Sequence, residues 1–375
     1  MTKAKGHILP FFIPHAGCPQ RCVFCDQKVI SGRTRPPLRD EIMKVMAENR
    51  AHPCQLAFYG GSFTAIPKEE QLFYLEIGAV GMERGWIDGI RISTRPDAVC
   101  EEVLRRLSVF GVQTVELGVQ SMDDDVLKRC KRGHSSKDSL RALRRLQETG
   151  FETGVQLMPG LPGETAAGAL RGAAEILALH PKFLRIYPTV VVEGTELARL
   201  YRQKKYRPLS LEQAVSLSLA LLLLAEKHDV RVIRMGLNPD PTLEQKVLAG
   251  PYHPAFGHLV KSDLWRRRFL WALDYFLEQH SRNELAAVYA DRSRMPMIFG
   301  QNGSNRAAYE ERLGRRPKVK SFPRELGVSD KEAILLQSID GHWTKVLPTM
   351  TDPDCLRELY RLFNATCCED KFMVK

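Results

Sequence analysis

The feature that most constrains the fold is a regular alternation of short apolar runs and longer amphipathic segments over residues 7–238. The short runs are rich in β-branched and aromatic residues, whereas the longer segments repeat apolar residues with the period of a helix. The expected strands are His7–Pro14, Gln55–Gly61, Gly89–Thr94, Gln113–Gln120, Glu152–Met158, Phe183–Val192 and Val230–Leu237. The expected helices are Arg39–Arg50, Lys68–Gly85, Cys100–Gly111, Lys137–Gly150, Thr165–His180 and Leu211–Asp229.

Strands and helices in this order predict a parallel sheet, because each helix returns the chain to the edge where the next strand begins. We therefore predict an α/β fold with a partial (β/α)6-type TIM barrel in residues 1–240 and a C-terminal α/β extension in residues 241–375. The boundary follows composition, since Pro, His and Arg become frequent past residue 240. In such barrels the functional residues lie at the carboxyl ends of the strands.

Three cysteines follow the first expected strand with the spacing C-x3-C-x2-C, namely Cys18, Cys22 and Cys25. Thiolates suit iron–sulfur clusters, and three from one loop leave one iron of a 4Fe–4S cluster open to a non-protein ligand. Two alternatives stay open. In the first, the thiols would form half of a zinc site, for which only His15 lies nearby in the sequence. In the second, they would be buried thiols without a metal. The spacing favours the open cluster.

The second expected strand ends in paired glycines, Gly60 and Gly61, within Phe58-Tyr-Gly-Gly-Ser-Phe-Thr64. Glycines of this kind expose backbone to a ligand, although the pair taken alone is often only a turn. Their place in the first βα repeat after the cysteine loop favours the ligand-binding interpretation.

The charge balance favours a polyanionic partner such as nucleic acid. The chain has a net charge of +11, and residues 261–324 hold 14 Lys and Arg against 7 Asp and Glu. This basic segment contains Arg266, Arg267 and Arg268 between Trp265 and Trp271, so that arginines would hold phosphates and rings would stack on bases. The alternative is an amphipathic helix whose tryptophans face the core.

Neither a signal-peptide pattern nor an apolar run of membrane-spanning length is present. We therefore expect a cytoplasmic protein without a membrane partner, in which the nine cysteines stay reduced. Oligomeric state has no signature in the sequence.

Together these motifs resemble the radical S-adenosylmethionine superfamily over roughly residues 7–260, and most of all its elongator catalytic subunit family, which modifies uridine in tRNA. The matching segments are Gly60-Gly-Ser-Phe-Thr64, Leu117-Gly-Val-Gln-Ser121, Arg132-Gly-His-Ser135, Met158-Pro-Gly-Leu-Pro162, Arg185-Ile-Tyr-Pro-Thr189, Gly194-Thr195 and Arg231-Val-Ile-Arg-Met235. Oxygen-independent coproporphyrinogen oxidases share some of these segments but not usually Arg185-Ile-Tyr-Pro-Thr189.

The resemblance implies two cofactors and a set of contacts. Cys18, Cys22 and Cys25 would bind three irons of a 4Fe–4S cluster, and S-adenosylmethionine would chelate the fourth. An electron from a low-potential donor such as flavodoxin or ferredoxin would then cleave S-adenosylmethionine to a 5′-deoxyadenosyl radical. The residues that match S-adenosylmethionine contacts in the family are Gly60, Gly61, Ser62, Ser93, Gln120, Arg132, Gln156, Met158 and Gly160. Related enzymes often carry an acidic residue or histidine at the position of Gln156.

The C-terminal extension departs from the elongator pattern. Full-length members continue into an acetyltransferase-like domain, and residues 260–375 show no Gly-rich loop of that kind. The segment Met295-Pro-Met-Ile-Phe-Gly-Gln-Asn-Gly-Ser-Asn-Arg306 is different, and Asn305 and Arg306 are candidates for RNA contacts. Cys355, Cys367 and Cys368 do not repeat the three-cysteine spacing, which argues against a second cluster.

Three functions compete on these grounds. The first is a radical enzyme that modifies a nucleobase in tRNA or rRNA, which the elongator-like segments and the basic extension favour. The second is a radical oxidoreductase acting on a small molecule such as a tetrapyrrole. The third is an RNA-binding protein that carries a cluster or zinc without turnover. The glycine-rich and Gln120-containing segments disfavour the third, since a pure binding protein has no need of a ligand-lined barrel mouth.

Overall fold

The computed structural model describes residues 7–13, 18, 22–26, 35–52, 54–323 and 327–346. Cys355, Cys367 and Cys368 lie outside the described residues, as does His15. The described residues divide into two compact units, one within residues 7–214 and 224–254 and another within residues 215–223 and 255–346. None of the helices in the described ranges combines the length and apolar character needed to cross a membrane.

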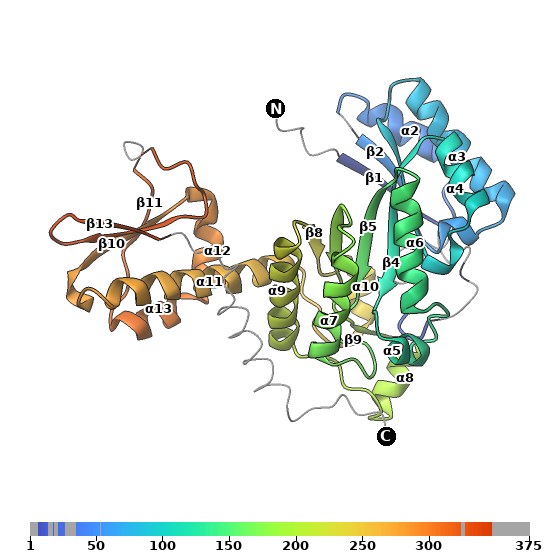
Figure 1. Cartoon of the computed structure of the whole chain (residues 1–375). Helices are drawn as coiled ribbons and strands as arrows, with labels where there is room; N and C mark the ends of the chain where they lie inside the picture. Colours follow the sequence, from blue (N-terminus) through green and yellow to red (C-terminus); the bar gives the residue numbers. More distant parts are fainter. Residues whose placement is uncertain are drawn as a thin grey trace. The chain divides into compact units, whose positions relative to one another are not determined.

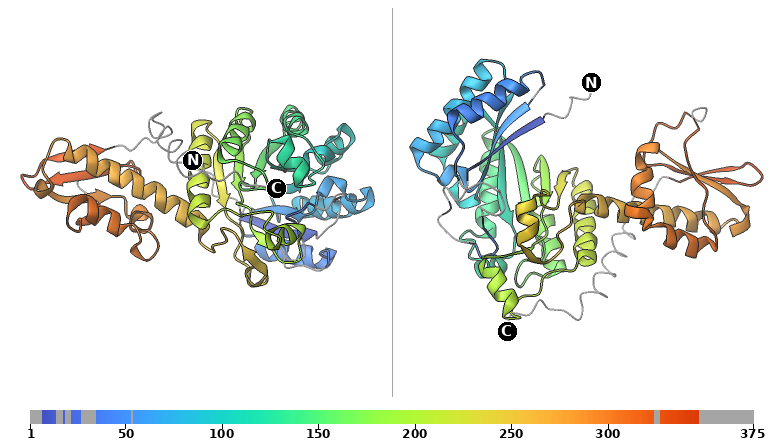
Figure 2. Two further views of the ribbon diagram at one scale, coloured as in Figure 1. Left: turned by 90° about the horizontal axis from the view of Figure 1, so that it is seen from below. Right: turned by 180° about the vertical axis from the view of Figure 1, so that it is seen from behind.

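The first unit is built on one parallel sheet of seven strands, curled into a half-barrel (Figures 1 and 2). The order is β1-β2-β3-β4-β5-β6-β8, and each neighbouring pair runs parallel. The bounds are β1 His7–Ile13, β2 Cys54–Gly60, β3 Gly89–Thr94, β4 Val112–Gln120, β5 Glu152–Leu157, β6 Phe183–Ile186 and β8 Arg231–Met235. The predicted partial barrel is thereby confirmed.

Helices alternate with these strands and pack on the sheet, as α2, α3, α4 and α6 do (Figure 1). Their bounds are α2 Arg39–Asn49, α3 Lys68–Glu83, α4 Glu101–Val109, α5 Asp124–Arg129, α6 Ser136–Glu148, α7 Ala166–Leu177, α8 Glu196–Arg202, α9 Leu211–Lys227 and α10 Pro241–Lys246. The sequence predicts the long ones but not α5, α8 and α10, each of which is too short to show a helical period. Because α10 belongs to the first unit, we propose the domain boundary near residue 254 instead of residue 240.

The prediction of one strand over Phe183–Val192 was wrong. The chain leaves the sheet after Ile186 and forms a second strand, β7 (Val191–Val192), which pairs antiparallel with β9 (Val247–Ala249). Pro188 stands at the break, where it has no N–H to offer to a ladder. After the break Tyr187, Pro188 and Val190 line a cavity instead of continuing the sheet.

The second unit has its own sheet and core, in agreement with the predicted α/β extension. The sheet has the order β11-β10-β12-β13, and its core joins α11 to the sheet through Trp265, Phe269 and Phe276. Trp265 is buried, whereas Trp271 is half exposed. The bounds are α11 Phe256–Leu277, β10 Leu285–Ala290, α12 Met295–Phe299, α13 Arg306–Leu313, β11 Val319–Ser321, β12 Ile334–Ser338 and β13 Trp343–Val346.

Candidate active site

A cavity of about 980 Å³ lies at the carboxyl ends of the strands in the first unit. Parallel strands place all their carboxyl ends at one edge of the sheet, so residues far apart in the sequence meet there. The predicted site residues that line this cavity are Cys18, Cys22, Cys25, Gly60, Gly61, Ser93, Gln120, Arg132, Gln156 and Met158. The residues that sequence motifs place at separate strand ends therefore share one wall.

The three cysteines of the first loop all face the cavity. The Nη1 atom of Arg132 donates a hydrogen bond to Sγ of Cys22 at 3.4 Å, and the backbone N–H of Ser62 points to the sulfur of Cys18. Within the described ranges, no three His, Cys, Asp or Glu side chains converge on a point where a single metal ion would sit. The thiols are spread along the wall.

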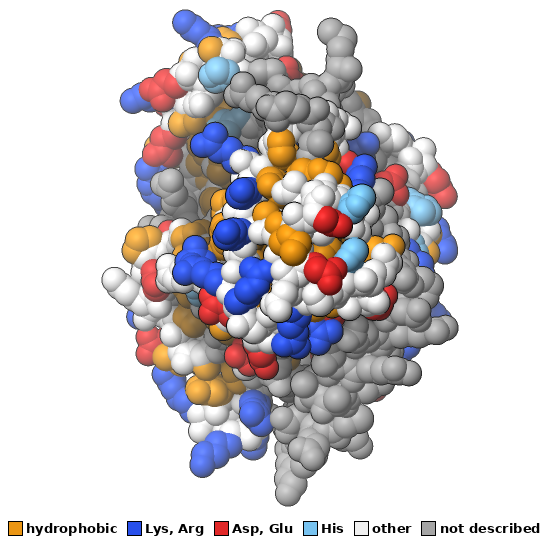
Figure 3. All heavy atoms as spheres, turned by 90° about the vertical axis from the view of Figure 1, so that its left-hand side faces the viewer, with side chains coloured by type: hydrophobic (Ala, Val, Ile, Leu, Met, Phe, Trp, Pro, Cys, Tyr) orange, Lys and Arg blue, Asp and Glu red, His pale blue; other side chains and the backbone are white. Residues whose placement is uncertain are grey.

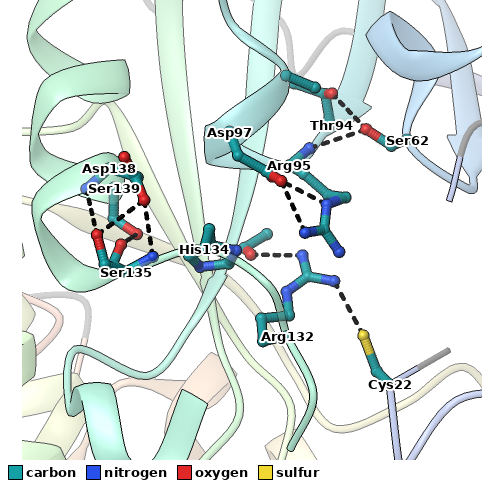
Figure 4. Close-up of polar contacts among 12 residues, drawn as sticks. Cys22, Ser62, Thr94, Arg95, Asp97, Arg132, His134, Ser135, Asp138 and Ser139 are labelled. Carbon is teal, nitrogen blue, oxygen red and sulfur yellow. Dashed lines mark hydrogen bonds and ion pairs between the residues drawn. The ribbon is translucent and has the colours of Figure 1, made fainter. Parts of the chain in front are cut away.

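Two buried guanidinium groups lie beside the thiols. Arg95 is 2% exposed and Arg132 is 7% exposed, and Figure 4 shows their guanidinium groups pointing toward each other. Arg95 donates to the carboxylate of Asp97 at 2.9 and 2.8 Å, whereas Arg132, among the described residues, donates only to the carbonyl of Gly118, at 2.7 Å, and to the sulfur of Cys22. Two positive charges thus share one carboxylate, and this end of the cavity carries surplus positive charge.

The surplus charge acts on the neighbouring groups. Burial raises the pKa of the Cys18 thiol above its usual value, and the charge of Arg132 works in the opposite direction. Burial, followed by the charge of Arg132, lowers the pKa of His134 to about 4, so this imidazole is neutral at physiological pH. Its Nε2 faces the carbonyl of Val119 at 3.2 Å and therefore carries the proton.

Two nitrogen atoms of the arginine pair have no hydrogen-bond partner among the residues that the structure describes. They are Nη1 of Arg95 and Nε of Arg132, both buried. A buried donor without an acceptor costs about 1–3 kcal/mol, so such atoms are expected where a ligand supplies the acceptor.

Glycine keeps this wall open at two points. Gly60 has a φ of +114°, and a Cβ there would lie 2.6 Å from the carbonyl oxygen of Ile13. A Cβ on Gly118 would lie 2.7 Å from Nε2 of Gln120 and 2.9 Å from Nη2 of Arg132. At both positions neighbouring atoms lie so close to the glycine Cα that only glycine fits without displacing them.

Gln120 ends β4 in a strained backbone conformation, with a φ of +71°. Residues other than glycine hold such a conformation only where the surrounding structure demands it, and functional sites are where they gather. The Oε1 atom of Gln120 accepts a hydrogen bond from Nε2 of Gln156 at 3.1 Å. The two amides therefore form one polar strip along β4 and β5.

Two of the predicted contact residues do not line the cavity. The hydroxyl of Ser62 is buried and bonds to the hydroxyl of Thr94 at 2.8 Å and to the N–H of Arg95 at 3.2 Å. Gly160 donates its N–H to Glu164 and accepts from the hydroxyl of Tyr206 at 2.7 Å. Both residues hold neighbouring segments in place.

The carboxylate of Glu164 is buried and ties two loops together, accepting from Ser121 Oγ at 2.8 Å and from the N–H of Gly160 at 2.9 Å. Burial raises its pKa to about 7, which exceeds the opposing effect of these hydrogen bonds. Between about pH 4.5 and pH 7 the folded protein keeps a proton that the unfolded chain has released. The free energy of unfolding attributable to this group therefore falls as the pH rises through that range.

A Glu164→Gln variant is accordingly expected to lose about 3 kcal/mol of the dependence of stability on pH between pH 5 and pH 8. Urea unfolding followed by circular dichroism at several pH values measures this. A variant whose unfolding free energy varies with pH as the wild type's does would show that Glu164 is ionised throughout.

The cavity also contains residues that sequence reasoning missed. Arg95, Tyr59, Glu116 and Tyr187 line it, and so does Arg185. The segment Arg185-Ile-Tyr-Pro-Thr189 stands out in the sequence, but nothing there pairs it with strands β2 and β4, where Tyr59 and Glu116 lie. That pairing depends on the curl of the sheet.

The RNA-contact candidates in the second unit are of two kinds: buried residues that contact other parts of the unit, and residues that are at least partly exposed. Arg268 is buried and pairs with Glu332, and the buried amide of Asn305 donates to three backbone carbonyls. Arg266 and Arg267 are partly exposed and share Asp263. Arg268 and Asn305 thus make contacts within the unit, and their predicted role in RNA binding stays a prediction.

Arg306 is exposed and lies over the ring of Phe299, 4.9 Å from its centroid. It stays a candidate for an RNA contact, as do Arg266 and Arg267. Figure 3 shows Lys and Arg side chains gathered beside a hydrophobic patch on one face of the molecule.

Comparison with known proteins identifies the family. The model of the radical SAM superfamily matches residues 12–169, and the radical SAM C-terminal domain matches residues 181–266. A tRNA uridine(34) acetyltransferase of Methanocaldococcus infernus is 37% identical over 127 residues, which are 33% of this chain and 24% of that protein. An uncharacterized protein of Methanocaldococcus jannaschii is 31% identical over 217 residues, 54% of this chain and 66% of that one.

A solved structure shares the fold. The archaeal Methanocaldococcus infernus Elp3 with an N-terminal deletion has a TM-score of 0.58 at 24% identity, covering 70% of this chain and 64% of that one. The chain spans about a quarter of the tRNA uridine(34) acetyltransferase that it matches in sequence. The half-barrel, the thiol-lined cavity at its strand ends and the two family matches agree, and the chain belongs to the radical S-adenosylmethionine superfamily of enzymes.

Proposed function

We propose that this protein binds a 4Fe–4S cluster through Cys18, Cys22 and Cys25 and cleaves S-adenosylmethionine to modify a nucleobase in RNA. The observation that carries the proposal is the presence of three thiols and two buried guanidinium groups in one cavity at the carboxyl ends of the strands. We take tRNA as the favoured substrate class, since relatives carry the name tRNA uridine(34) acetyltransferase.

The residues present fit both cofactors. A cluster held by three thiolates is rich in negative charge, and the surplus positive charge of Arg95 and Arg132 matches it. The carboxylate of S-adenosylmethionine would supply an acceptor for Nε of Arg132, which has none among the described residues. The strip formed by Gln120 and Gln156 supplies amide groups for the ribose hydroxyls.

When bound, the two cofactors would supply radical chemistry at an unactivated carbon. The chain's own residues then have three tasks. Gly60 and Gly118 keep space for the ligand, Arg132 orients it, and the apolar side chains of the cavity wall exclude water. The thiols release their protons when iron binds, so loading becomes less favourable at low pH, the more so because burial raises the pKa of Cys18.

One experiment tests the enzymatic part. The protein, reconstituted anaerobically with iron and sulfide, is expected to hold about four irons per chain and to form 5′-deoxyadenosine with a strong reductant or with reduced flavodoxin. Nucleosides from total tRNA and rRNA, with and without the gene, are then compared by mass spectrometry. A reconstituted protein that leaves S-adenosylmethionine intact would refute the proposal, and an unchanged RNA profile would refute its substrate.

The RNA part predicts a strong dependence on salt. The net charge of +11 implies several phosphate contacts, so affinity for tRNA is expected to fall by about a thousandfold or more between 50 and 200 mM salt. If Arg306 neutralises one phosphate, Arg306→Gln should make the slope of log affinity against log salt shallower by about one. Binding that ignores salt would contradict an electrostatic contact with RNA.

A further inference from the structure

A second polar cluster lies in the same cavity and includes no cofactor-contact candidate. It joins four strands: Tyr59 from β2, Arg91 from β3, Glu116 from β4 and Arg185 from β6, with Tyr187 just beyond β6. All of these residues except Arg91 line the cavity. Glu116 is 5% exposed and Arg91 is 8% exposed. Buried ion pairs contribute little to stability compared with apolar residues of the same volume, so this cluster has no evident structural purpose.

The cluster's carboxylate accepts three hydrogen bonds on one of its two oxygens and an ion pair on the other. Glu116 Oε1 accepts from Tyr59 Oη at 2.9 Å, from Arg91 Nη1 at 2.9 Å and from Arg185 Nη2 at 3.1 Å. Its other oxygen lies 2.6 Å from Nε of Arg185. Two guanidinium groups against one carboxylate leave a net charge of +1.

The donors that remain belong to Arg185 and Tyr187. Nη1 of Arg185 donates one N–H to the hydroxyl oxygen of Tyr187 at 2.9 Å. In the part of the chain that the structure describes, Nε of Arg185 is buried without a hydrogen-bond partner, and the hydroxyl of Tyr187 accepts this one hydrogen bond and keeps its own hydrogen for another acceptor. Both residues line the cavity, so the cluster offers it hydrogen-bond donors and positive charge.

The surroundings of these donors suit a flat ring. Phe12 and Tyr59 line the cavity with their ring centroids 6.0 Å apart, and Pro188 lies beside Tyr187 on the same wall. Gln156 is the register neighbour of Arg185 on the adjacent strand, and its amide reaches Gln120. The cluster therefore adjoins the polar strip assigned to the cofactor.

We propose that the hydroxyl of Tyr187, held in place by Arg185, binds a carbonyl oxygen of the pyrimidine base that the enzyme modifies. The inference rests on the proposed function, because it takes the substrate to be a nucleobase. A pyrimidine offers a ring for the aromatic wall and a carbonyl for the donor. Tyr187 is thus a substrate-binding residue that sets which base enters.

The test removes the hydroxyl and the carbonyl separately and together. Full-length reconstituted protein is titrated, by fluorescence anisotropy, with a short RNA stem-loop that has one loop uridine. The same RNA is also prepared with 2-pyrimidinone, which lacks the 4-oxygen, and with 4-pyridinone, which lacks the 2-oxygen. The wild type is expected to prefer uridine over one of these by about threefold to tenfold, and Tyr187→Phe is expected to lose that preference.

Controls separate the hydroxyl from general damage. Tyr187→Phe keeps the ring, and a thermal melt checks that it stays folded. Tyr201→Phe, on the exposed face of α8, should keep the wild-type preference.

Three results would overturn the inference. The first is a Tyr187→Phe variant that discriminates among the three RNAs as the wild type does, and the second is a wild type that does not discriminate. The third is acetate displacing RNA from the wild type but not from Tyr187→Phe at constant ionic strength, which would assign the donors to a carboxylate. 5′-Deoxyadenosine and modified nucleoside are measured in the same samples to keep the two proposals apart. If the wild type forms both products while Tyr187→Phe discriminates among the RNAs as the wild type does, only the role of Tyr187 is refuted.

Discussion

A Cys22→Ala variant is expected to lose its iron–sulfur cluster and to form 5′-deoxyadenosine at least a hundredfold more slowly than the wild type. Replacing groups that merely support metal ligands costs tenfold to a hundredfold, so removing a ligand costs more. The substitution also deprives the buried Nη1 of Arg132 of its sulfur partner, which leaves that guanidinium with the carbonyl of Gly118 alone. Iron content per chain, visible absorbance and 5′-deoxyadenosine yield after anaerobic reconstitution measure the effect.

The matched control is Cys100→Ala. Cys100 is exposed at the start of α4 and makes no side-chain cap to the helix, so its replacement should leave iron content and turnover unchanged. If Cys22→Ala holds as much iron as the wild type and cleaves S-adenosylmethionine as fast, the three-thiol cluster is not the catalytic centre. Loss of iron in both variants would point to general damage instead.

A Gly118→Ala variant is expected to bind S-adenosylmethionine about tenfold to a hundredfold more weakly than the wild type. The added methyl group would lie 2.7 Å from Gln120 Nε2 and 2.9 Å from Arg132 Nη2, so both side chains must move. Overpacking of this kind costs about 1–3 kcal/mol, and here the cost falls on two proposed ligand contacts. Equilibrium binding of S-adenosylmethionine to the reconstituted protein measures it.

Gly150→Ala separates binding from stability. Gly150 ends the turn after α6 with a φ of +90°, and a Cβ there meets nothing within 4 Å. This substitution should cost about 1–2 kcal/mol of stability through backbone strain and leave S-adenosylmethionine affinity unchanged. Wild-type affinity in Gly118→Ala would mean that Gln120 and Arg132 do not contact the ligand.

Most of the half-barrel could be predicted because its signals are local. The strand–helix alternation survives in any window of the sequence, and Gly111 and Gly150, both of positive φ, mark the ends of helices. Pro188 was a local signal that the strand predicted over Phe183–Val192 is interrupted. The apolar residues on both sides of Pro188 nevertheless favoured the prediction of one continuous strand. The helices α5, α8 and α10 are too short to show the helical period of apolar residues by which a helix is recognised in a sequence.

The candidate site could be predicted only where residues act as a motif. Cys18, Cys22 and Cys25 are recognisable by spacing, and Gly60 and Gly61 by adjacency. Arg95 and Glu116 belong to no motif, and their importance comes from burial beside residues on other strands. The contacts of Arg268 and Asn305 depend likewise on what surrounds them, since arginine and asparagine in a basic segment suggest nucleic acid and do not reveal their partners within the unit.

By itself the sequence determined the sheet, the order of its strands and the presence of the three-thiol loop, because periodicity and spacing depend on residues near one another in the chain. Only the tertiary structure decided which side chains share the cavity. The curl of the sheet joins Tyr59, Glu116 and Arg185 from three strands, and it sets Arg132 against Cys22 across 110 positions of sequence. Electrostatic and hydrogen-bonding effects depend on distance in space and on burial, and neither can be read from position along the chain.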